Sequence, residues 1–437
     1  ALGGVKEASA SKGPDLNSRT RSTDCLGPPE GSDYLLGRKS LHFYSFNRDG
    51  IFMLTAFVPR ETHPGETRVA ATPDTVARLI KAGFAVSVQS QAGEGAYIND
   101  DAYRKAGATI VTDAPAGYGA ADLVLKFHPP TSEEVEQMKQ GSLLISFLWP
   151  TRNLDLVRSL KAKQMSCLAM DCMPRITRAQ KMDALSSQAN ISGYKAVIMA
   201  ANHLPKIFPM MTTPAGTIKP AHVVILGAGV AGLQAVATAK RLGAIVEVSD
   251  VRPAVKEQVE SLGGKYIEVP PDENAKEVED KDGYAKEQSA EFLARQRELV
   301  KARIEQADVV ITTAAIPGKP APKLVTEEMV QNMRVGSVVV DLAVETGGNC
   351  ELSVPGETVV KHGVTLVGMK NVPGLIPVNS SEMYAKNILN LISDMMDREG
   401  NFRVDLEDAA VGGCTVLHEG KVVHAATAEA LGEKGEQ

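Results

Sequence analysis

The chain has 437 residues, 43% of them hydrophobic and 23% charged, which is enough for two or three domains with sizeable cores. Its net charge of -6 and pI of about 5.9 give no general case for nucleic-acid binding, and no apolar stretch is long enough to cross a membrane. The five cysteines are scattered without ligand-like spacing, so they indicate neither disulfides nor a metal site and fit a reducing compartment.

The N-terminal residues are unlike those that follow. Residues 1 to about 52 are rich in Ser, Gly, Arg and Asp and show no sustained periodicity. Their acids and bases are nearly balanced, unlike those of an organellar transit peptide, and they lack the apolar core of a secretory signal. We predict that residues 1–55 are a disordered extension or an upstream translation, and that the fold starts near Met53, the first methionine.

From Phe57 onward, predicted strands alternate with predicted helices. In the first half we expect helices at 73–82, 132–139 and 153–163 and strands at 85–88, 121–127, 142–148 and 167–169. In the second half we expect a helix at 233–242, another at 380–396, and strands at 223–226, 245–248, 266–269, 309–312, 337–342 and 365–367. Weak strand signals follow at 415–417 and 421–423. The alternation indicates parallel sheets covered by helices on both faces, the α/β class.

A glycine turn joins the first two strands of the second half. The order is a strand, Gly227-Ala-Gly229-Val-Ala-Gly232, a helix, a second strand and Asp250. Gly227 permits a tight turn, Gly229 lets the backbone approach a pyrophosphate, and Gly232 lets the helix pack close to the strand. Asp250 lies where an acid can accept hydrogen bonds from an adenosine ribose and repel a 2′-phosphate. This stretch predicts a dinucleotide site that prefers NAD(H) to NADP(H).

Two polar stretches are further candidates. The insertion at 270–292 has no apolar period and is expected to be a binding loop or a disordered linker. The stretch 174–188 gathers charged and polar side chains between the two halves, and a helix starting near Arg178 would place Gln180, Asp183 and Ser187 on one face. An alternative is that Thr177 and Gln180 form a capping box, with Arg178 and Asp183 as solvated helix charges. No nucleophile and base pair, HExxH or paired-cysteine motif appears, so the chemistry is expected to be that of a cofactor.

Five phrases of the sequence resemble the NAD(H)-binding component, domain I, of proton-translocating NAD(P) transhydrogenase, in the alanine dehydrogenase/transhydrogenase family. They are PRITRAQKMDALSSQANISGYKAV, GAGVAGLQAVATAKRLGAIVEVSDVR, DGYAKE, TTAAIPGKPAPKLVTEEMV and GSVVVDLAVETGGNC. The similarity runs from about Ala56 to the C-terminus. It implies two Rossmann-like doubly wound parallel-sheet domains with a cleft between them, one formed by 56–188 plus 375–437 and an NAD(H)-binding one formed by 189–374.

The resemblance also implies roles for individual residues. The RITRAQKMD loop is expected to overhang the nicotinamide, and the expected catalytic residues, which contact the cofactor or bridge to NADP(H) on a partner, are Arg175, Gln180, Asp183 and Ser186. The insertion is expected to be a mobile loop that closes on the nucleotide. The implied cofactor contacts are Arg175, Ile176, Thr177, Arg178, Gly227, Gly229, Val230, Gly232, Asp250, Val251, Arg252, Gly283, Tyr284, Ala314 and Ala315. Without the resemblance, Tyr284 would be an ordinary loop aromatic and Arg252 a surface charge.

The sequence distinguishes transhydrogenases from the related alanine dehydrogenases. The latter need a carbonyl-binding Arg and Lys plus a His, because a proton moves together with the hydride. Arg68 and Lys126 match the first two positions, but Trp149 stands where the His is expected. His128 is interpreted as a loop residue and not as a replacement. Hydride passes directly between the C4 atoms of two nicotinamides, so a transhydrogenase needs no side-chain acid or base.

We therefore expect reversible hydride transfer from NADH on this chain to NADP+ on a partner subunit, coupled in the full complex to proton translocation. The resemblance implies a homodimer attached to the cytoplasmic face of the membrane, with membrane-spanning and NADP(H)-binding subunits as partners. The alternatives are a soluble alanine dehydrogenase-like enzyme and a non-catalytic NAD(H) sensor. One departure is the turn Gly374-Leu375-Ile376-Pro377, where the family usually has Ser-Arg after KNVP, so the contacts of that turn are open.

Overall fold

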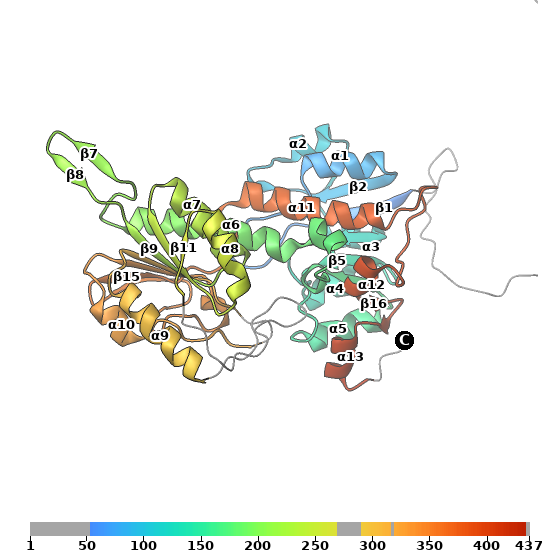
Figure 1. Ribbon diagram of the computed structural model, residues 1–437. Helices are drawn as coiled ribbons and strands as arrows, with labels where there is room; N and C mark the ends of the chain where they lie inside the picture. The colour runs from blue at the N-terminus through green and yellow to red at the C-terminus, as the bar shows by residue number, and fades with distance from the viewer. Residues whose placement is uncertain (1–52, 269–289, 316–318, 434–437) are drawn as a thin grey trace, which may run out of the picture. The chain divides into compact units, whose positions relative to one another are not determined.

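The computed structural model describes residues 53–268, 290–315 and 319–433, and two large sheets organise them (Figure 1). The first sheet has the strand order β17-β16-β6-β5-β4-β1-β2-β3. Its strands are β1 (Leu54–Val58), β2 (Phe84–Gln89), β3 (Thr109–Val111), β4 (Leu123–Leu125), β5 (Leu143–Ser146), β6 (Ser166–Ala169), β16 (Thr415–His418) and β17 (Lys421–Val422). All neighbouring pairs are parallel except β6 with β16 and β16 with β17.

The second sheet has the order β11-β10-β9-β12-β13-β15-β14. Its strands are β9 (His222–Leu226), β10 (Ile245–Ser249), β11 (Lys265–Tyr266), β12 (Val309–Thr312), β13 (Val338–Asp341), β14 (Thr358–Lys361) and β15 (Val364–Val367). Only β14 is antiparallel to its neighbour. The predicted α/β class with two parallel-sheet domains is confirmed. The cleft between them and the domain boundaries stay predictions.

Helices cover both faces of each sheet, and the alternation of side chains along the strands explains why. In β1, Ala56 and Val58 belong to one apolar cluster and Phe57 to another, and in β9 Val223 and Val224 divide in the same way. On the first sheet the covering helices are α1 (Pro73–Lys81), α2 (Asp100–Lys105), α11 (Pro377–Asp394) and α12 (Ala409–Cys414) on one face, and α3 (Ala114–Ala120), α4 (Ser132–Gln137), α5 (Leu154–Ala162) and α13 (Ala425–Leu431) on the other. On the second sheet they are α6 (Ala184–His203), α7 (Val230–Arg241) and α8 (Lys256–Ser261) on one face, and α9 (Ala290–Ile304) and α10 (Glu327–Asn332) on the other.

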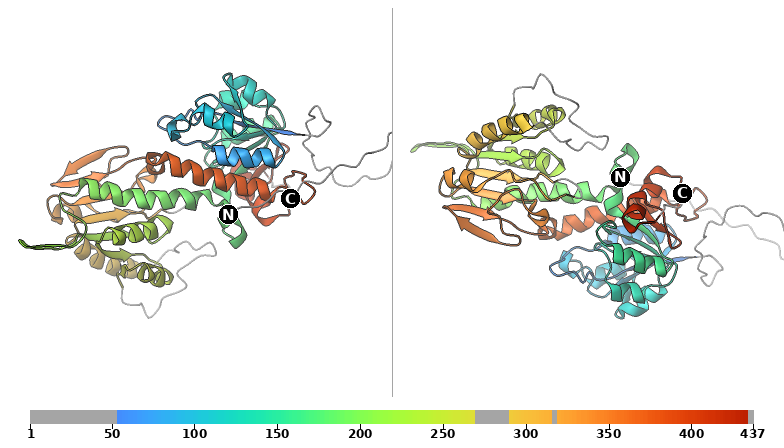
Figure 2. Two further views of the ribbon diagram at one scale, coloured as in Figure 1. Left: turned by 90° about the horizontal axis from the view of Figure 1, so that it is seen from above. Right: turned by 90° about the horizontal axis from the view of Figure 1, so that it is seen from below.

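Two long helices run side by side, α6 and α11, drawn in green and orange-red (Figure 2). Helix α6 also packs on α7, and Gly193 lies against Ala231 of α7. A side chain at Gly193 would place its Cβ 2.0 Å from the carbonyl oxygen of Ala231, so only glycine permits this packing. Among the described residues, no helix combines the length and the apolar character that a membrane crossing requires.

Several details differ from the sequence prediction. Helix α7 begins at Val230 and not at 233, because it starts directly after Gly229. The strand expected at 266–269 is the two-residue strand β11, and position 269 lies outside the described residues. A hairpin of β7 (Met211–Thr213) and β8 (Gly216–Ile218) was not predicted; all six of its residues are exposed, so no alternation between buried and exposed side chains marks it.

Candidate functional site

The order of the second sheet reverses between β9 and β12. From β9 the chain passes to β10 on one side, whereas β12 and β13 lie on the other. The two strands are in parallel register, with Ile225 beside Ile311 and Leu226 beside Thr312, so the glycine turn and the segment after Thr312 leave the same edge of the sheet together. Such a reversal, at the carboxyl ends of parallel strands, is where nucleotides bind in open α/β sheets.

The three glycines of the turn have different surroundings. Gly227 has a φ of +103° and lies so close to Thr313 that a Cβ would be 2.6 Å from its Oγ1. A Cβ at Gly232 would lie 1.9 Å from the carbonyl oxygen of Gly227, which forces α7 close to the turn. A Cβ at Gly229 would meet no atom within 4 Å, and its φ of -74° suits any residue. The fold therefore requires Gly227 and Gly232, while the position of Gly229 is open for a ligand to approach.

The N-terminus of α7 follows immediately. Its N-cap is Gly229, which has no side chain to accept from the N–H groups of the first turn. Val230 is 39% exposed, so this end of the helix reaches solvent. Unpaired N–H groups and the helix dipole make such a terminus suited to a phosphate.

Asp250 follows β10 and is largely buried, with a side chain 6% exposed. Its carboxylate accepts hydrogen bonds from the backbone N–H of Ala228 at 2.7 Å and of Arg252 at 2.9 Å. The guanidinium of Arg252 donates to the same carboxylate from Nε at 2.9 Å and from Nη2 at 3.0 Å. A carboxylate offers about four acceptor positions, so a ribose hydroxyl has to share them with Arg252 or displace it. Both the preference for NAD(H) and the ribose contact stay predictions, and the structure shows that each involves the Asp250–Arg252 pair.

The structure gathers most of the predicted nucleotide contacts around this turn. Gly227, Gly229, Val230 and Gly232 belong to it, Asp250 holds Ala228, and Val251 and Arg252 follow Asp250. Ala314 is half-buried and Ala315 exposed, and the N of Ala314 lies 3.3 Å from where a Cβ at Gly227 would be. Gly283 and Tyr284 lie outside the described residues.

The RITRAQKMD loop forms a short 3-10 helix from Thr177 to Met182. Ala179 and Met182 are fully buried and anchor it in the first sheet's core. The predicted contact residues Arg175, Ile176, Thr177, Arg178 and Gln180 are exposed. The loop therefore presents polar side chains to its surroundings from a backbone that two apolar residues hold.

The two local interpretations of this loop were wrong. Ile176, not Thr177, is the N-cap of the 3-10 helix and makes no side-chain cap, so Thr177 and Gln180 form no capping box. Gln180, Asp183 and Ser187 do not share a helix, because the 3-10 helix ends at Met182 and α6 begins at Ala184. Asp183 is the N-cap of α6: it accepts from the N–H of Ser186 at 2.8 Å and from its Oγ at 2.5 Å. Asp183 and Ser186, both predicted site residues, are thus a hydrogen-bonded pair.

Arg178 is half exposed but is not a solvated charge. Its guanidinium pairs with Asp394 at 3.1 Å and with Asp408 at 2.5 Å, and Lys181 joins Asp394 at 2.5 Å. Asp408 is also the N-cap of α12. Arg178 therefore ties the loop to α11 and α12, and its predicted cofactor contact stays untested.

A second reversal of strand order lies between β1 and β4 of the first sheet, and buried charges fill it. Lys126, 1% exposed, lies 2.9 Å from Glu134 and 3.4 Å from Glu61. Arg68 pairs with Glu66 at 2.7 Å, and its guanidinium lies 3.7 Å from the centre of the Phe127 ring. The two cations matched to a carbonyl site are thus bound to the protein's own carboxylates.

Glu66 is the centre of this cluster. Burial by itself raises the pKa of Glu66, but hydrogen bonds from Arg68 and His128 outweigh it and hold the pKa well below its usual range. The same Arg68 donates to Gln188 of α6 at 3.0 Å and to Asn371 at 2.6 Å. His128 lies 2.5 Å from Glu66 and stacks on His63, which agrees with its interpretation as a loop residue.

Trp149 is the residue that the resemblance matches to the histidine of alanine dehydrogenases. Its φ of +47° is unusual for a bulky residue, and the carboxylate of Asp171 holds this turn through the N–H groups of Leu148 at 2.7 Å and Trp149 at 3.0 Å. The indole ring stacks on Phe147, and the residue is 39% exposed. An indole cannot exchange a proton with a substrate at neutral pH, so this position supplies no acid or base.

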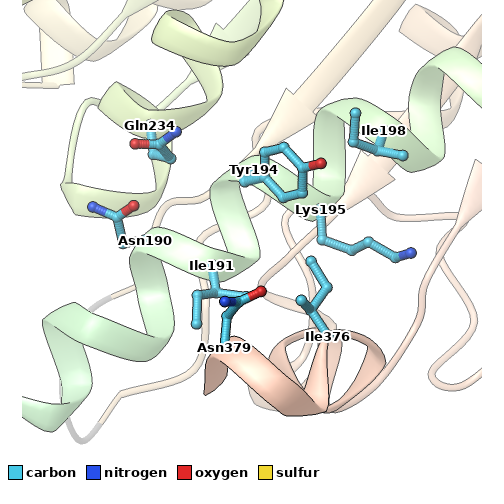
Figure 3. Close-up of a pocket in the computed structure, with 8 residues that line it drawn as sticks. All are labelled: Asn190, Ile191, Tyr194, Lys195, Ile198, Gln234, Ile376 and Asn379. Atoms are coloured by element: carbon cyan, nitrogen blue, oxygen red, sulfur yellow. The ribbon is translucent and has the colours of Figure 1, made fainter. Parts of the chain in front are cut away.

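A shallow hollow of about 460 Å³ lies between α6, α7 and the start of α11 (Figure 3). It contains none of the predicted site residues, although it is lined by Ile376, which belongs to the Gly374–Pro377 turn that differs from the usual family sequence. Its lining residues are Asn190, Ile191, Tyr194, Lys195, Ile198, Gln234, Ile376 and Asn379. Within the described ranges, no group of three His, Cys, Asp or Glu side chains could hold a metal ion.

Comparisons with known proteins agree on the family. The description "Alanine dehydrogenase/PNT, N-terminal domain" matches residues 57–192, and "Alanine dehydrogenase/PNT, C-terminal domain" matches residues 196–425. An NAD(P) transhydrogenase alpha-subunit protein of Rhodospirillum rubrum is 50% identical over 375 residues, covering 84% of this chain and 97% of that protein. A solved transhydrogenase from Sinorhizobium meliloti is 43% identical with a TM-score of 0.75, over 84% of this chain and 100% of that one. An L-alanine dehydrogenase structure is 25% identical with a TM-score of 0.71, over 87% and 99%. The chain belongs to the alanine dehydrogenase/PNT family, and the resemblance to transhydrogenase alpha subunits is confirmed.

Proposed function

We propose that this chain is the NAD(H)-binding subunit of a proton-translocating transhydrogenase. The observation that carries the nucleotide part of this proposal is the open position of Gly229 at the reversal of strand order, with α7 starting behind it and Asp250 beside it. A pyrophosphate at the first turn of α7 would accept hydrogen bonds from backbone N–H groups to which no capping side chain is bonded. NAD(H), when bound, supplies the hydride chemistry.

The transfer of hydride to a second nucleotide is favoured over an amino-acid dehydrogenase by Trp149. Oxidation of an amine needs a group that takes a proton, and neither the indole nor Lys126, closed between two carboxylates, offers one. The relatives named above as transhydrogenases are also more similar to this chain than the alanine dehydrogenase is. Transfer between two rings depends on approximation, at roughly 3 to 3.5 Å, and on exclusion of water.

The RITRAQKMD loop is the part of the chain proposed to bring the two rings together. Arg175, Gln180 and the Asp183–Ser186 pair lie on or next to this exposed loop, whose backbone is held by Ala179 and Met182. A fixed backbone that presents polar side chains suits contact with a cofactor on one side and a partner subunit on the other. Partners are proposed to be NADP(H)-binding and membrane-spanning subunits, with the chain as a homodimer on the cytoplasmic face of the membrane.

The decisive experiment mixes this chain with an isolated NADP(H)-binding transhydrogenase component and follows hydride exchange between NADH and an NADP+ analogue. Exchange only in the mixture supports the proposal. Formation of NADH from alanine and NAD+ by this chain alone would instead support an alanine dehydrogenase. Tight NADH binding without turnover in either assay would support a sensor.

Gln180 offers a narrower test. Its side chain is exposed and belongs to no capping box, so Gln180→Asn shortens it without removing a structural contact seen here. A displacement of about 1 Å at a reacting geometry can cost on the order of 100-fold in rate. We expect hydride exchange in the mixture to fall by that order while the Kd for NADH, measured by fluorescence titration, stays unchanged. An equal loss of exchange rate and of NADH affinity would remove Gln180 from the positioning of the second ring.

A further inference from the structure

Asn349 is fully buried and bonds to the backbone of Ala314, one of the predicted nucleotide contacts. Its Oδ1 accepts from the N–H of Ala314 at 3.0 Å, and its Nδ2 donates to the carbonyl oxygens of Ala314 and Pro322, both at 2.8 Å. Its own carbonyl oxygen accepts from Leu324 at 2.8 Å and Val325 at 3.0 Å. One residue thus joins two stretches of chain, 314 and 322–325.

The two hydrogen bonds to Ala314 take the place of pairing with a neighbouring strand. The ladder between β12 and β13 ends where Thr312 pairs with Asp341, and Ala314 lies two residues farther on. The side-chain amide offers Ala314 one donor and one acceptor, as a residue of a neighbouring strand would. Asn349 therefore continues the order of the sheet beyond its last regular pair.

Asp341 fixes the direction of Asn349. It is 1% exposed and accepts from the N–H of Cys350 at 2.9 Å, from the N–H of Ala343 at 3.0 Å and from Thr312 Oγ1 at 3.0 Å. The bond to Cys350 is directly next to Asn349. The buried carboxylate thus holds the turn from which the amide points toward Ala314.

Ala314 in turn adjoins the glycine turn. The preceding Thr313 donates from Oγ1 to the carbonyl oxygen of Gly227 at 3.0 Å, so the backbone at 313–314 and the turn are bound together. We propose that Asn349 is a positioning residue for NAD(H): by holding the backbone of Ala314, it fixes the place of Ala314 beside the glycine turn. The inference rests on the proposed nucleotide site and names a residue that acts on it without touching the ligand.

The test compares Asn349→Ala and Asn349→Asp with a control, Asn153→Ala. Asn349→Asp keeps the size but turns a carboxylate oxygen toward the carbonyls of Ala314 and Pro322. Asn153 also donates from its side chain to a backbone carbonyl, that of Leu148 at 2.7 Å, but in the first sheet's half of the chain. Loss of such bonds corresponds to about a tenfold change in an equilibrium constant. We expect the Kd for NADH to rise about tenfold for both Asn349 variants and to stay unchanged for Asn153→Ala.

A purely structural role would change other quantities. It would lower the melting temperature and the fraction of active protein, and hence kcat, in both the Asn349 and Asn153 variants. A positioning role raises the KM for NADH in the mixed assay and leaves the KM for NADP+ unchanged. If Asn349→Ala does not fold, Asn349→Ser and Asn349→Asp provide the same comparison.

Folded Asn349 variants that bind NADH as the unaltered chain does would overturn the positioning role. A failure of the unaltered chain to bind NADH would contradict the proposed function itself, so the two failures are distinguishable.

Discussion

The strands β3-β2-β1-β4-β5 of the first sheet and β11-β10-β9-β12-β13 of the second follow the same order, and each set has a reversal. The two reversals are nevertheless filled in opposite ways. Between β9 and β12 the chain leaves an open position at Gly229 and an uncapped helix end. Between β1 and β4 it places Lys126, Glu61 and Glu134, with the Arg68–Glu66 pair nearby, all with buried side chains.

The difference teaches that the topology provides a possible binding site at each reversal, and that the side chains decide which one stays open to a ligand. Lys126 and Arg68 are the two residues that the resemblance matches to a carbonyl-binding pair, but here internal carboxylates and amides use their donors. A substrate carboxylate would have to displace these groups, at the cost of leaving buried charges without partners. A phosphate at the glycine turn would not have to displace any buried charged group.

The largest change in the free energy of unfolding is expected at the charged cluster between β1 and β4. Glu66→Gln leaves Arg68 buried without its carboxylate, and breaking a buried pair costs roughly 3 to 5 kcal/mol in the free energy of unfolding. Urea denaturation measures this, with Asp155→Asn as the control because the Asp155–Arg158 pair is exposed. NADH affinity of the folded variant should not change. A loss no larger than that of the control would contradict the importance of the buried pair.

The same glutamate makes part of the stability depend on pH. Because the pKa of Glu66 is lowered in the folded protein from its ordinary value of 4.5, its contribution is complete above that value and is lost as the pH falls. The difference in unfolding free energy between the unaltered chain and Glu66→Gln should therefore shrink when denaturation is repeated at successively lower pH. A constant difference would show that Glu66 is not ionised in the fold.

The next largest effect is expected at Gly232. The Cβ of Gly232→Ala would lie 1.9 Å from the carbonyl oxygen of Gly227, so α7 must move away from the turn. Overpacking of this kind costs roughly 1 to 3 kcal/mol in stability, and displacement of the helix end should also abolish measurable NADH binding. Thermal unfolding and fluorescence titration test both effects. Normal NADH affinity would separate the turn from the nucleotide site.

Asp250→Ala is expected to weaken NADH binding by roughly 1.5 to 3 kcal/mol, the range for hydrogen bonds to a charged group. It also removes the carboxylate paired with Arg252, a residue type that accommodates a 2′-phosphate, so binding of NADPH should weaken less or improve. Titrations with both nucleotides give the ratio. Unchanged NADH affinity would reject the ribose assignment.

The smallest effect on the fold sharpens the comparison most. Gly229→Ala meets no atom of the protein within 4 Å and needs no unusual φ, so the free energy of unfolding should change by no more than about 0.5 kcal/mol. NADH binding should nevertheless weaken by about tenfold or more, because the methyl group occupies the approach of the pyrophosphate. Paired with Gly232→Ala, it separates a glycine kept for the ligand from one kept for packing.

Elements with a strong local pattern were predictable from the sequence. The strand β9, the glycine turn, α7 and β10 were found because apolar runs and glycines lie next to one another in the chain. The capping box at Thr177 failed since the same residue types fit two different helix starts, and the buried packing of Ala179 and Met182 decided between them.

The partners of buried polar groups were not predictable. Lys126 was recognised, but Glu61 and Glu134 reach it from a loop and a helix whose local sequence gives no sign of the contact. Asn349 was within a quoted phrase without a role, because its partner Ala314 is 35 residues away. The consecutive glycines before it were a signal of a constrained turn, since both Gly347 and Gly348 have positive φ.

The contact of Gly193 with Ala231 fixes the position of α6 relative to α7. Helix α6 starts at the Asp183 cap beside the loop, and Gly193 lies about 14 Å farther along it, at 1.5 Å per residue. There it touches the first turn of α7, at the proposed resting place of the phosphates. Because no side chain separates the two helices there, the first turn of α7 lies directly against α6. The proposed phosphate site and the loop before Asp183 are therefore placed relative to each other by one helix, α6.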